Sequence, residues 1–328
     1  MASSSSSTTT TRVPTPSELL AELTKRRQEP LTHWKAIGPR IGKYVDSSDE
    51  KKTYKGINKD IVKAYGGGGT KLKKSSTPLT EDTKLDEGES KANGAVLGKL
   101  VDRQLRQAIT LMRTNGWSFD KMILKCGGKM HRRSMNILLF IKQQRLIPIA
   151  CQLSVSCETS RRATDLDMLL WDPATKQYIL FEVKCGYNYS NYQIGTVAMY
   201  PPFEALMDCE YHRHMIQLLV TLVLFKRTFN VDNVSGLLIR VTNSTVYHYP
   251  LERWALDCEA SITACFLVRG GLTRQINTIK LLNATTTTDA ATTKKSKKST
   301  TKKKSATKRK VAAAASSSKS KKRLFTCQ

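Results

Sequence analysis

Two apolar segments joined by a short polar turn constrain the fold of this chain more than any other feature. Residues 165–171 read DLDMLLW, and residues 178–184 read YILFEVK. The residues between them, Asp172-Pro173-Ala174-Thr175, are typical of a turn. The pattern therefore predicts a β-hairpin whose loop is slightly longer than the tightest type.

Charged residues interrupt this apolar hairpin on one side only. Side chains alternate between the two faces of a strand, so Glu182 and Lys184 share a face with Leu180. By the same alternation, Asp165 and Asp167 share one face of the first strand. Burying carboxylates costs free energy unless a cation compensates them. Two carboxylates with a lysine beside them therefore predict a divalent-cation site.

Such a site suits the hydrolysis of phosphodiester bonds. Mg²⁺, or Mn²⁺ in its place, prefers oxygen ligands, and we expect Asp167, Glu182 and the backbone carbonyl of Val183 to supply them. The metal would polarise an attacking water and bind a phosphate oxygen. Lys184 would orient or deprotonate that water, or stabilise the charge of the transition state.

The flanking sequence predicts that the hairpin belongs to an α/β domain with a mixed sheet. A helical stripe of apolar residues covers 95–112, and a strongly apolar helix is expected over 212–229. The remaining expected elements are strands at 146–155, 234–241 and 245–249, a helix at 134–144 and a closing helix over 251–264.

Composition divides the chain into five stretches. Residues 1–12 are a Ser/Thr tract that should be disordered. Residues 13–69 are a basic N-terminal region that is either partly helical, with Ser17 capping a short helix, or an arm that orders on DNA. The other three are a linker at 70–93, the folded domain at 94–282 and a disordered Lys-rich tail at 283–328.

The hairpin and the helix that follows it resemble the PD-(D/E)XK nuclease superfamily. There an Asp precedes an apolar strand and a turn, and a second apolar strand ends in E-x-K; here the stretch reads TDLDMLLWDPATKQYILFEVK. The segment EVKCGYNYSNY and the helix YHRHMIQLLVTLVLF are most similar to RecB-like and lambda-exonuclease-like nucleases of large DNA viruses. The resemblance covers about residues 94–260. It implies a restriction-endonuclease-like core, with a mixed central sheet flanked by helices.

The resemblance also implies roles for individual residues. Asp167, Glu182 and Lys184 would be catalytic together with Gln217, which would position the metal-bound water or the scissile phosphate. His214 lies one turn before Gln217 on the same helix face and is a secondary candidate.

The sequence departs from the family pattern in two places. No Pro precedes Asp167, and Asp165 competes with it for the catalytic assignment. Many members carry a Glu on the first helix, whereas this helix offers only Asp102 as an acid, which leaves a second metal site open.

Structural explanations compete with these roles. Asp167, Glu182 and Lys184 would also form a salt-bridge ladder on an exposed sheet face, although Leu180 on the same face argues for burial. Gln217 could simply cap a buried carbonyl, and a lone His such as His214 is more often packed than catalytic.

Charge indicates nucleic acid, most simply DNA, as the partner. The formal net charge is +27 and the pI is about 9.9, which attracts polyanions. We expect Arg161, Arg162 and Tyr187 beside the hairpin to contact it, although exposed Arg pairs and loop tyrosines often have no specific partner. The acid-free stretch 294–323 resembles nuclear localisation signals, which predicts import receptors as partners and the nucleus, or the host nucleus of a virus, as the location.

Other classes of protein fit less well. The 8 cysteines contain no C-x-x-C pair, and no His pair completes a zinc pattern. The polar N-terminus does not resemble a secretory signal, and the longest apolar run, 215–225, is too short to span a bilayer. We therefore expect a Mg²⁺-dependent deoxyribonuclease, with a catalytically inactive nucleic-acid-binding or virion-associated protein of the same fold as the alternative.

Overall fold

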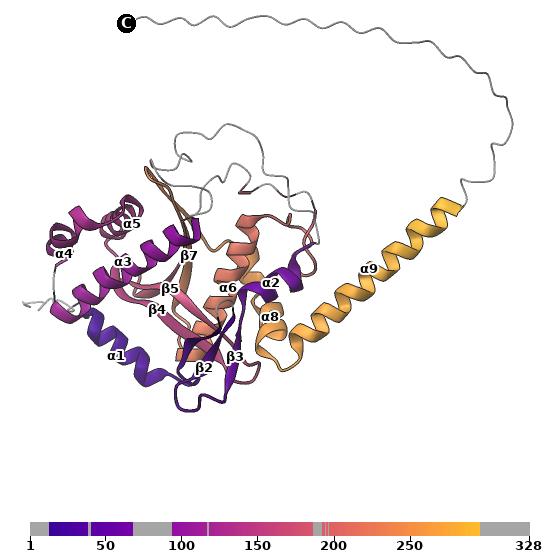
Figure 1. The fold of residues 1–328 in the computed structure, drawn as a ribbon, viewed down its shortest axis with the longest axis horizontal. Coiled ribbons are helices and arrows are strands. Elements are labelled where there is room, and N and C mark those ends of the chain that lie inside the picture. Colours follow the sequence, from indigo (N-terminus) through magenta and orange to yellow (C-terminus); the bar gives the residue numbers. More distant parts are fainter. Residues whose placement is uncertain are drawn as a thin grey trace, which may run out of the picture. The chain divides into compact units, whose positions relative to one another are not determined.

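The computed structural model describes residues 13–38, 41–67, 94–116, 118–185, 192–193, 195 and 197–295. Within these residues the centre of the molecule is a mixed sheet of eight strands with helices on its faces (Figure 1). The expected α/β architecture with a mixed, helix-flanked sheet is therefore confirmed. The Ser/Thr tract, the linker and the Lys-rich tail beyond Lys295 lie outside the described residues.

The elements follow one another along the chain with few long connections. The strands are β1 (Thr32–Gly38), β2 (Ile41–Asp46), β3 (Thr53–Gly56), β4 (Ile147–Cys157), β5 (Arg162–Asp172), β6 (Gln177–Lys184), β7 (Val234–Val241) and β8 (Val246–Pro250). The helices are α1 (Pro16–Arg26), α2 (Asn58–Tyr65), α3 (Gly94–Asn115), α4 (Phe119–Cys126), α5 (Arg132–Gln143), α6 (Glu210–Phe229), α7 (Arg253–Asp257), α8 (Glu259–Ile262) and α9 (Gly271–Lys295).

Strand β5 is the centre of the sheet, and its two edges are used differently. One edge pairs with β4 over nearly the whole strand, from Arg162 to Trp171. Because that edge is taken, β3 and β6 must share the other edge. β3 pairs in parallel with Arg162 and Ala163, whereas β6 pairs antiparallel from Met168 to Asp172. Residues 164–167 therefore have no strand partner on this edge among the described residues.

The two faces of the sheet bury separate hydrophobic cores. Helix α6 lies on one face and shares a core with α1, α2 and the residues around α8, and this core includes Leu169 and Leu180. Helices α3, α4 and α5 cover the opposite face, with Met168 and Phe181 in their core. Leu180 and Phe181 of β6 therefore lie on opposite faces of the sheet, as the alternation of side chains along the strand predicts.

Strict alternation fails on β5, in the middle of the predicted hairpin strand. It predicts Leu166 on the face of Met168, but Leu166 packs in the same core as Leu169. Two irregularities of β4 lie opposite this part of β5: a register shift between Pro148 and Ala150, and Gln152, the residue across from Asp167. Gln152 has a left-handed φ of 53°, and the Gln152–Asp167 step is missing from the β4–β5 ladder. A local bulge-like distortion of this kind re-aims side chains and breaks a simple period of two.

The N-terminal region is part of the same compact unit as the hairpin. The unit ends at Leu281 and includes residues 13–67, which the sequence suggested as a separate region. Ile57 and Tyr65 are fully buried, and the Tyr65 ring lies 4.8 Å from that of Phe203 and 5.9 Å from that of Phe266. The basic, aromatic-rich stretch thus supplies three strands and two helices of one fold.

The start of α1 and the course of the closing helix differ from the sequence prediction. Thr15, not Ser17, caps α1: Glu18 N–H donates to Thr15 Oγ1 (3.3 Å) and Thr15 N–H donates to the Glu18 carboxylate (2.7 Å). Pro16 at the first helical position favours this start. The expected closing helix is broken into α7 and α8 at Cys258.

Helix α9 extends past the predicted domain end at residue 282, although the compact unit itself ends at Leu281. It continues to Lys295, through residues that the sequence assigned to a disordered tail. Extending an existing helix adds one hydrogen bond for each residue fixed, so the Thr-rich segment need not start a helix itself. No helix within the described residues is long and apolar enough to cross a membrane.

Tyr65→Ala should test whether the N-terminal region shares the core. Removing this buried ring should lower the free energy of unfolding by about 3 to 5 kcal/mol and shift a single cooperative transition. Urea denaturation followed by circular dichroism measures it, with Val96→Ala, an exposed position, as the control expected to stay within about 0.5 kcal/mol. A second, unshifted transition would show that residues 13–67 fold apart from the rest.

Candidate active site

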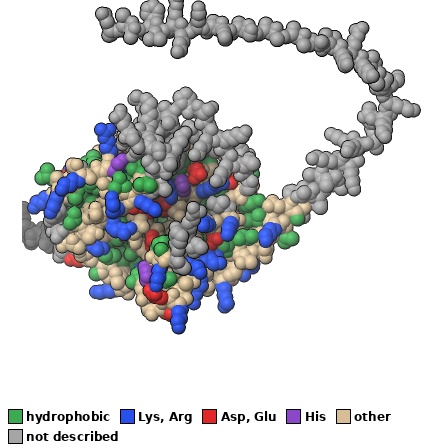
Figure 2. All heavy atoms as spheres, in the orientation of Figure 1, with side chains coloured by type: hydrophobic (Ala, Val, Ile, Leu, Met, Phe, Trp, Pro, Cys, Tyr) green, Lys and Arg blue, Asp and Glu red, His purple; other side chains and the backbone are tan. Residues whose placement is uncertain are grey.

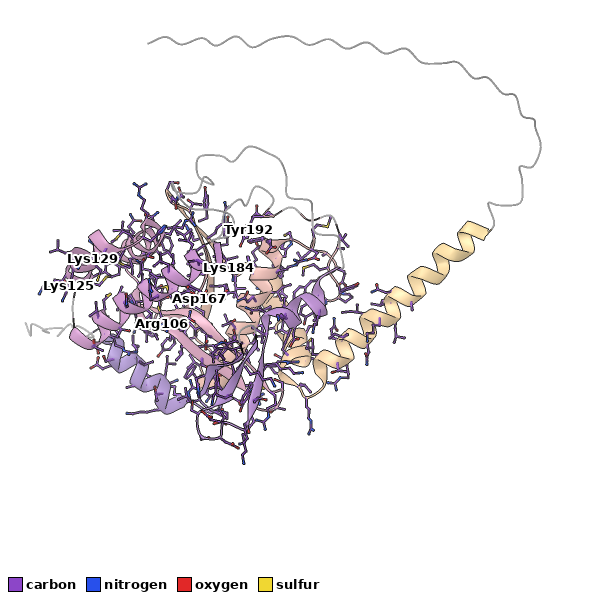
Figure 3. All side chains as sticks on the ribbon, viewed as in Figure 1. Arg106, Lys125, Lys129, Asp167, Lys184 and Tyr192 are labelled. Atoms are coloured by element: carbon purple, nitrogen blue, oxygen red, sulfur yellow. The ribbon has the colours of Figure 1, made fainter. Side chains whose placement is uncertain are left out.

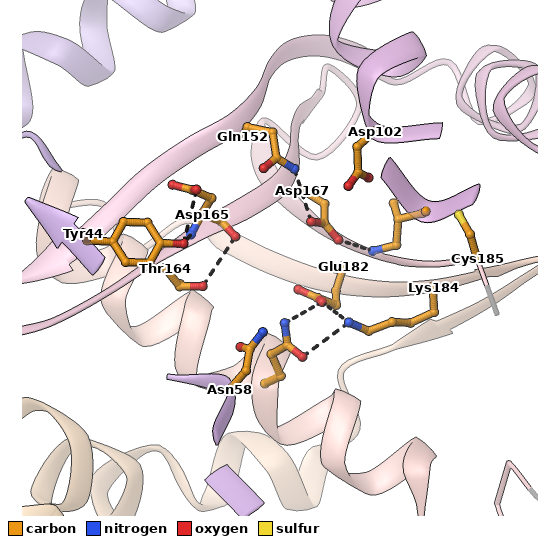
Figure 4. Close-up of a pocket in the computed structure, with 13 residues that line it drawn as sticks. Tyr44, Asn58, Asp102, Gln152, Thr164, Asp165, Asp167, Glu182, Lys184 and Cys185 are labelled. Atoms are coloured by element: carbon orange, nitrogen blue, oxygen red, sulfur yellow. Dashed lines mark hydrogen bonds and ion pairs between the residues drawn. The ribbon is translucent and has the colours of Figure 1, made fainter. Parts of the chain in front are cut away.

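A polar cavity opens where β5 lacks a strand partner. Its volume is about 280 Å³, and Thr164, Asp165 and Asp167 of the unpaired segment line it. Glu182 and Lys184 reach it from the end of β6, where that strand has diverged from β5. A break in the sheet thus creates the space into which these charged groups point (Figure 4).

Side chains from both faces of the sheet meet in this cavity. Asp102 comes from α3, on one face, and Gln217 comes from α6, on the other. The lining residues are Tyr44, Asn58, Gly98, Asp102, Gln152, Thr164, Asp165, Asp167, Glu182, Val183, Lys184, Cys185 and Gln217. The cavity therefore contains all four predicted catalytic residues, Val183 and two of the three secondary candidates.

Asp167 is fixed by the backbone of the neighbouring strand. Val183 N–H donates to its Oδ2 at 2.7 Å, and Gln152 Nε2 makes only a long contact of 3.5 Å with its Oδ1. The N–H and C=O of one residue in a strand point to the same side. The Val183 carbonyl therefore also faces Asp167, as the predicted ligand set requires.

Gln217 connects Glu182 with Lys184. Its Nε2 donates to Glu182 Oε1 at 2.6 Å, and its Oε1 accepts from Lys184 Nζ at 3.3 Å. Lys184 Nζ also donates to Glu182 Oε1, so the three polar groups form a closed triangle (Figure 4). The Gln217 side chain therefore binds two site residues rather than capping a buried carbonyl.

The competing explanation of an exposed salt-bridge ladder does not fit this geometry. Glu182 is only 2% exposed, and the Lys184 side chain is 18% exposed. An ion pair buried to this degree loses more hydration than a surface pair and is weak evidence of a stabilising role.

Burial and mutual repulsion hold the carboxyl groups in a proton-retaining state. Desolvation is the largest cause in each case, and it raises the pKa of Asp102 and of Asp165 to about 6 and that of Glu182 to about 7. The pKa of Asp167 is raised as well, mainly by burial and against the opposing charge of Lys184. For Asp167 and Glu182, burial therefore outweighs the compensating charge of Lys184.

Asp165 and Asp167 occupy different environments, which separates their roles. Tyr44 O–H donates to Asp165 Oδ2 at 3.2 Å, and Asp165 N–H donates back to the tyrosine oxygen at 3.1 Å. Asp167 instead contacts Val183 and lies close enough to Glu182 for their charges to interact. The geometry therefore favours Asp167 as the partner of Glu182, and Asp165 as the carboxylate that anchors Tyr44.

Asp102 stands at the edge of the site beside a basic side chain. The charge of Asp167 raises its pKa, while Arg106 and Lys184 lower it. Arg106, Asp167 and Lys184 lie towards the middle of the fold in Figure 3, whereas Lys125 and Lys129 lie at its periphery. Asp102 thus lines the cavity close enough to Asp167 for their charges to interact.

The other predicted residues lie outside the cavity. The pKa of His214 is held well below its ordinary value, mainly by burial and then by Lys184 and Arg213, and its Nδ1 is hydrogen-bonded to Tyr192 O–H at 3.0 Å. Arg162 forms an ion pair with Asp60 at 3.0 Å. The Arg161 guanidinium lies 5.3 Å from the Tyr54 ring, and Tyr187 is outside the described residues.

Besides Thr164 at the start of the motif, sequence reasoning missed four polar or reactive side chains of the cavity. Tyr44 and Asn58 come from the N-terminal region, and Gln152 comes from β4. Cys185 follows Lys184 directly, and burial raises the pKa of its thiol to about 12, so it stays protonated. Only Cys185 lay within the motif; the other three are brought in by strand pairing over long sequence distances.

The donor chemistry of the cavity fits a hard divalent cation. Its ionisable acids are carboxyl groups, and Mg²⁺ and Mn²⁺ prefer oxygen ligands. Among the described residues, Glu182 Oε2 has no hydrogen-bond partner, and Asp167 Oδ1 has only its long contact with Gln152. Within the described part of the chain, no three His, Cys, Asp or Glu side chains are grouped closely enough to hold a metal ion by themselves.

Compared with known protein families and with curated proteins, the chain matches no family model and no curated sequence.

Asp102→Asn should stabilise the protein at pH 8 but not at pH 4 when EDTA is present. The folded-state pKa of Asp102 is raised from 3.8 to about 6, so the folded protein holds this proton more tightly than the unfolded chain. The associated stability is fully present below about pH 4 and is lost as pH rises through about 6. Removing the charge should recover roughly 1 to 2 kcal/mol at pH 8, after allowance for solvent screening.

Urea denaturation at the two pH values measures this difference. Asp120→Asn, at a side chain that is 73% exposed, is the matched control and should change stability by less than about 0.5 kcal/mol at either pH. An equal gain for Asp102→Asn at pH 4 and pH 8 would contradict the electrostatic origin.

Proposed function

We propose that this chain is a metal-dependent nuclease that hydrolyses phosphodiester bonds of DNA, with a restriction-endonuclease-like core. The observation that carries the proposal is the convergence of Asp167, Glu182, Lys184 and Gln217 in one cavity. These residues come from two strands and a helix, and the motif had singled them out together.

Energetics support a catalytic rather than a structural role for this set. Several carboxyl groups with raised pKa values in one cavity destabilise the fold, and such clusters are typical of functional sites. A divalent cation bound between Asp167 and Glu182 would offset the repulsion, polarise the phosphodiester and lower the pKa of the attacking water.

Each residue has a task that its contacts define. The Val183 N–H fixes one oxygen of Asp167, which keeps the other oxygen directed into the cavity as a ligand. Gln217 orients Glu182 through its Nε2 and Lys184 through its Oε1, so it acts as a positioning residue for both. Lys184 carries protons on Nζ beside the ligands and can donate to a phosphate oxygen as negative charge develops there.

The charge of the molecule supports DNA as the substrate class. Lys and Arg side chains occur across the whole face shown in Figure 2, rather than in one compact patch. A diffuse positive surface attracts a polyanion without reading its sequence. The resemblance to nucleases of large DNA viruses and the Lys-rich stretch at 294–323 extend the proposal to viral DNA processing, recombination or repair in a nucleus.

Cleavage by the full chain should require a divalent metal and the site residues. Linear and circular DNA would be incubated with Mg²⁺, Mn²⁺ or EDTA, and Lys184→Ala and Glu182→Gln should each lower the rate at least about 100-fold because they remove transition-state stabilisation. The circular substrate tests whether cleavage needs free ends. Parallel reactions with RNA and with single-stranded DNA define which nucleic acid is cleaved.

Lys176→Asn is the matched control because Lys176 is an exposed lysine at the turn of the same hairpin. Its φ of 54° is left-handed, a conformation that Asn tolerates, so the turn should be retained and the rate unchanged. A folded wild-type protein that binds DNA but cuts none of the substrates with either metal would favour the inactive binding protein instead.

A further inference from the structure

A row of four cations crosses four adjacent strands of the sheet. Lys35 on β1 pairs with Lys43 on β2, and continuing the β2–β3 register one residue beyond the Tyr44–Tyr54 pair places Lys43 opposite Lys55. Lys55 in turn pairs with Arg162 at the start of β5. Residues directly opposite one another share a face, and like charges in such positions destabilise a sheet.

Carboxylates compensate this row only at its two ends. Lys35 forms an ion pair with Glu50, and Arg162 forms one with Asp60 at 3.0 Å. Within the described part of the chain, Lys43 and Lys55 in the middle of the row form no ion pair. The positive charge is therefore concentrated where the two lysines face each other.

A cavity lies against the uncompensated part of the row. Its volume is about 200 Å³, and no carboxylate lines it; its lining consists of Lys43, Thr53, Lys55, Ser160, Arg161 and Arg162. Ser160 Oγ is buried and has no hydrogen-bond partner among the described residues. A buried hydroxyl without a partner is uncommon in folded proteins and indicates a missing ligand or water.

Arg161 is held at this cavity by a constrained backbone. Its φ of 55° is left-handed, which non-glycine residues adopt rarely and often at functional sites. Its guanidinium lies 5.3 Å from the centre of the Tyr54 ring, and Glu158, which does not line the cavity, is 4.0 Å away. The Arg161 side chain is 45% exposed and is therefore accessible to an anion.

We propose that this cavity is a phosphate-binding site. A phosphate group offers several acceptor oxygens, which suits two lysines, two arginines and the hydroxyls of Thr53 and Ser160. The phosphate comes either from a nucleic-acid backbone or from a free phosphate or monoester. Adjacent residues of a strand point to opposite faces, so Lys43 faces away from Tyr44 and the site is separate from the cavity of Asp167. The proposal therefore does not depend on nuclease activity.

The competing explanation is that lysines on these strands only discourage edge-to-edge aggregation. That role requires charge but neither a cavity nor the Ser160 hydroxyl. Ser160→Ala, which leaves the net charge unchanged, therefore separates a built site from a solvated charge row.

The first experimental arm measures the melting temperature of the full chain with inorganic phosphate or chloride at equal ionic strength. Wild type should melt higher in phosphate, because a ligand that binds the folded state stabilises it. The Lys43→Gln/Lys55→Gln variant should melt higher than wild type in chloride, since its repulsion is removed, and should lose the phosphate effect. Ser160→Ala should reduce the phosphate effect, whereas Lys51→Gln/Lys121→Gln, which removes the same charge from exposed positions, should retain it.

The second arm measures binding of a DNA oligonucleotide in EDTA across a range of salt concentrations, so that no cleavage is involved. If a backbone phosphate occupies the site, Lys43→Gln/Lys55→Gln should lower the slope of log affinity against log salt by about 1, the value for one phosphate, relative to the Lys51→Gln/Lys121→Gln control. Loss of the phosphate effect with an unchanged slope would assign the site to free phosphate or a monoester. Equal phosphate stabilisation of all variants, with equal slopes, would overturn the proposal.

Discussion

The interrupted edge of β5 is the constraint on which the rest of the structure depends. β3 and β6 share this edge, but among the described residues neither pairs there with residues 164–167, which pair only with β4 on the opposite edge. Backbone and side chains in that interval can therefore face a cavity instead of a neighbouring strand. The same gap admits Asp102 from one face of the sheet and Gln217 from the other. A continuous ladder would have kept these two helices on opposite sides of a closed layer.

The hydrophobic cores on the two faces of the sheet compensate the unfavourable electrostatics of the site. Its carboxyl groups repel one another and are desolvated, which raises their pKa values and disfavours the folded state at neutral pH. The two large cores on either side of the sheet supply the compensating free energy through apolar burial. Helix α6 contributes to both the hydrophobic core and the polar cavity. Most of its side chains are buried in the core, and Gln217 is the polar side chain that it presents to the cavity. Such a division is typical of functional sites, where local rules are violated and the remainder of the fold compensates.

The sequence predicted what depends on local pattern. The hairpin, the long apolar helix and the mixed sheet follow from periodicity, and the grouping of Asp167, Glu182 and Lys184 follows from alternation along two strands. Leu166 shows the limit of that argument, because a distorted step opposite Gln152 shifts its side chain to the other core. The sequence pattern could not predict Tyr44 and Asn58 as site residues, because their place in the site depends on β3 pairing with a strand more than a hundred residues later. The lysines and aromatics of residues 32–56 do alternate, with Lys43 next to Tyr44 and Lys55 next to Tyr54. The pattern contains few aliphatic residues, however, so the sequence predicts either a partly helical region or a basic arm here.

The shared core of residues 13–67 and 94–281 has a consequence for how this molecule is assembled. Neither stretch alone contains both Tyr44 and Asp165, whose hydrogen bonds join the N-terminal ribbon to the cavity. The stretches are held together by strand pairing and by burial of residues such as Ile57 and Tyr65, in addition to the peptide chain that connects them. Two separate polypeptides divided between residues 67 and 94 thus contain the complementary surfaces needed to reconstitute the fold by association. The two stretches of this single chain thus contact each other through strand pairing and apolar burial, as two subunits of a dimer would.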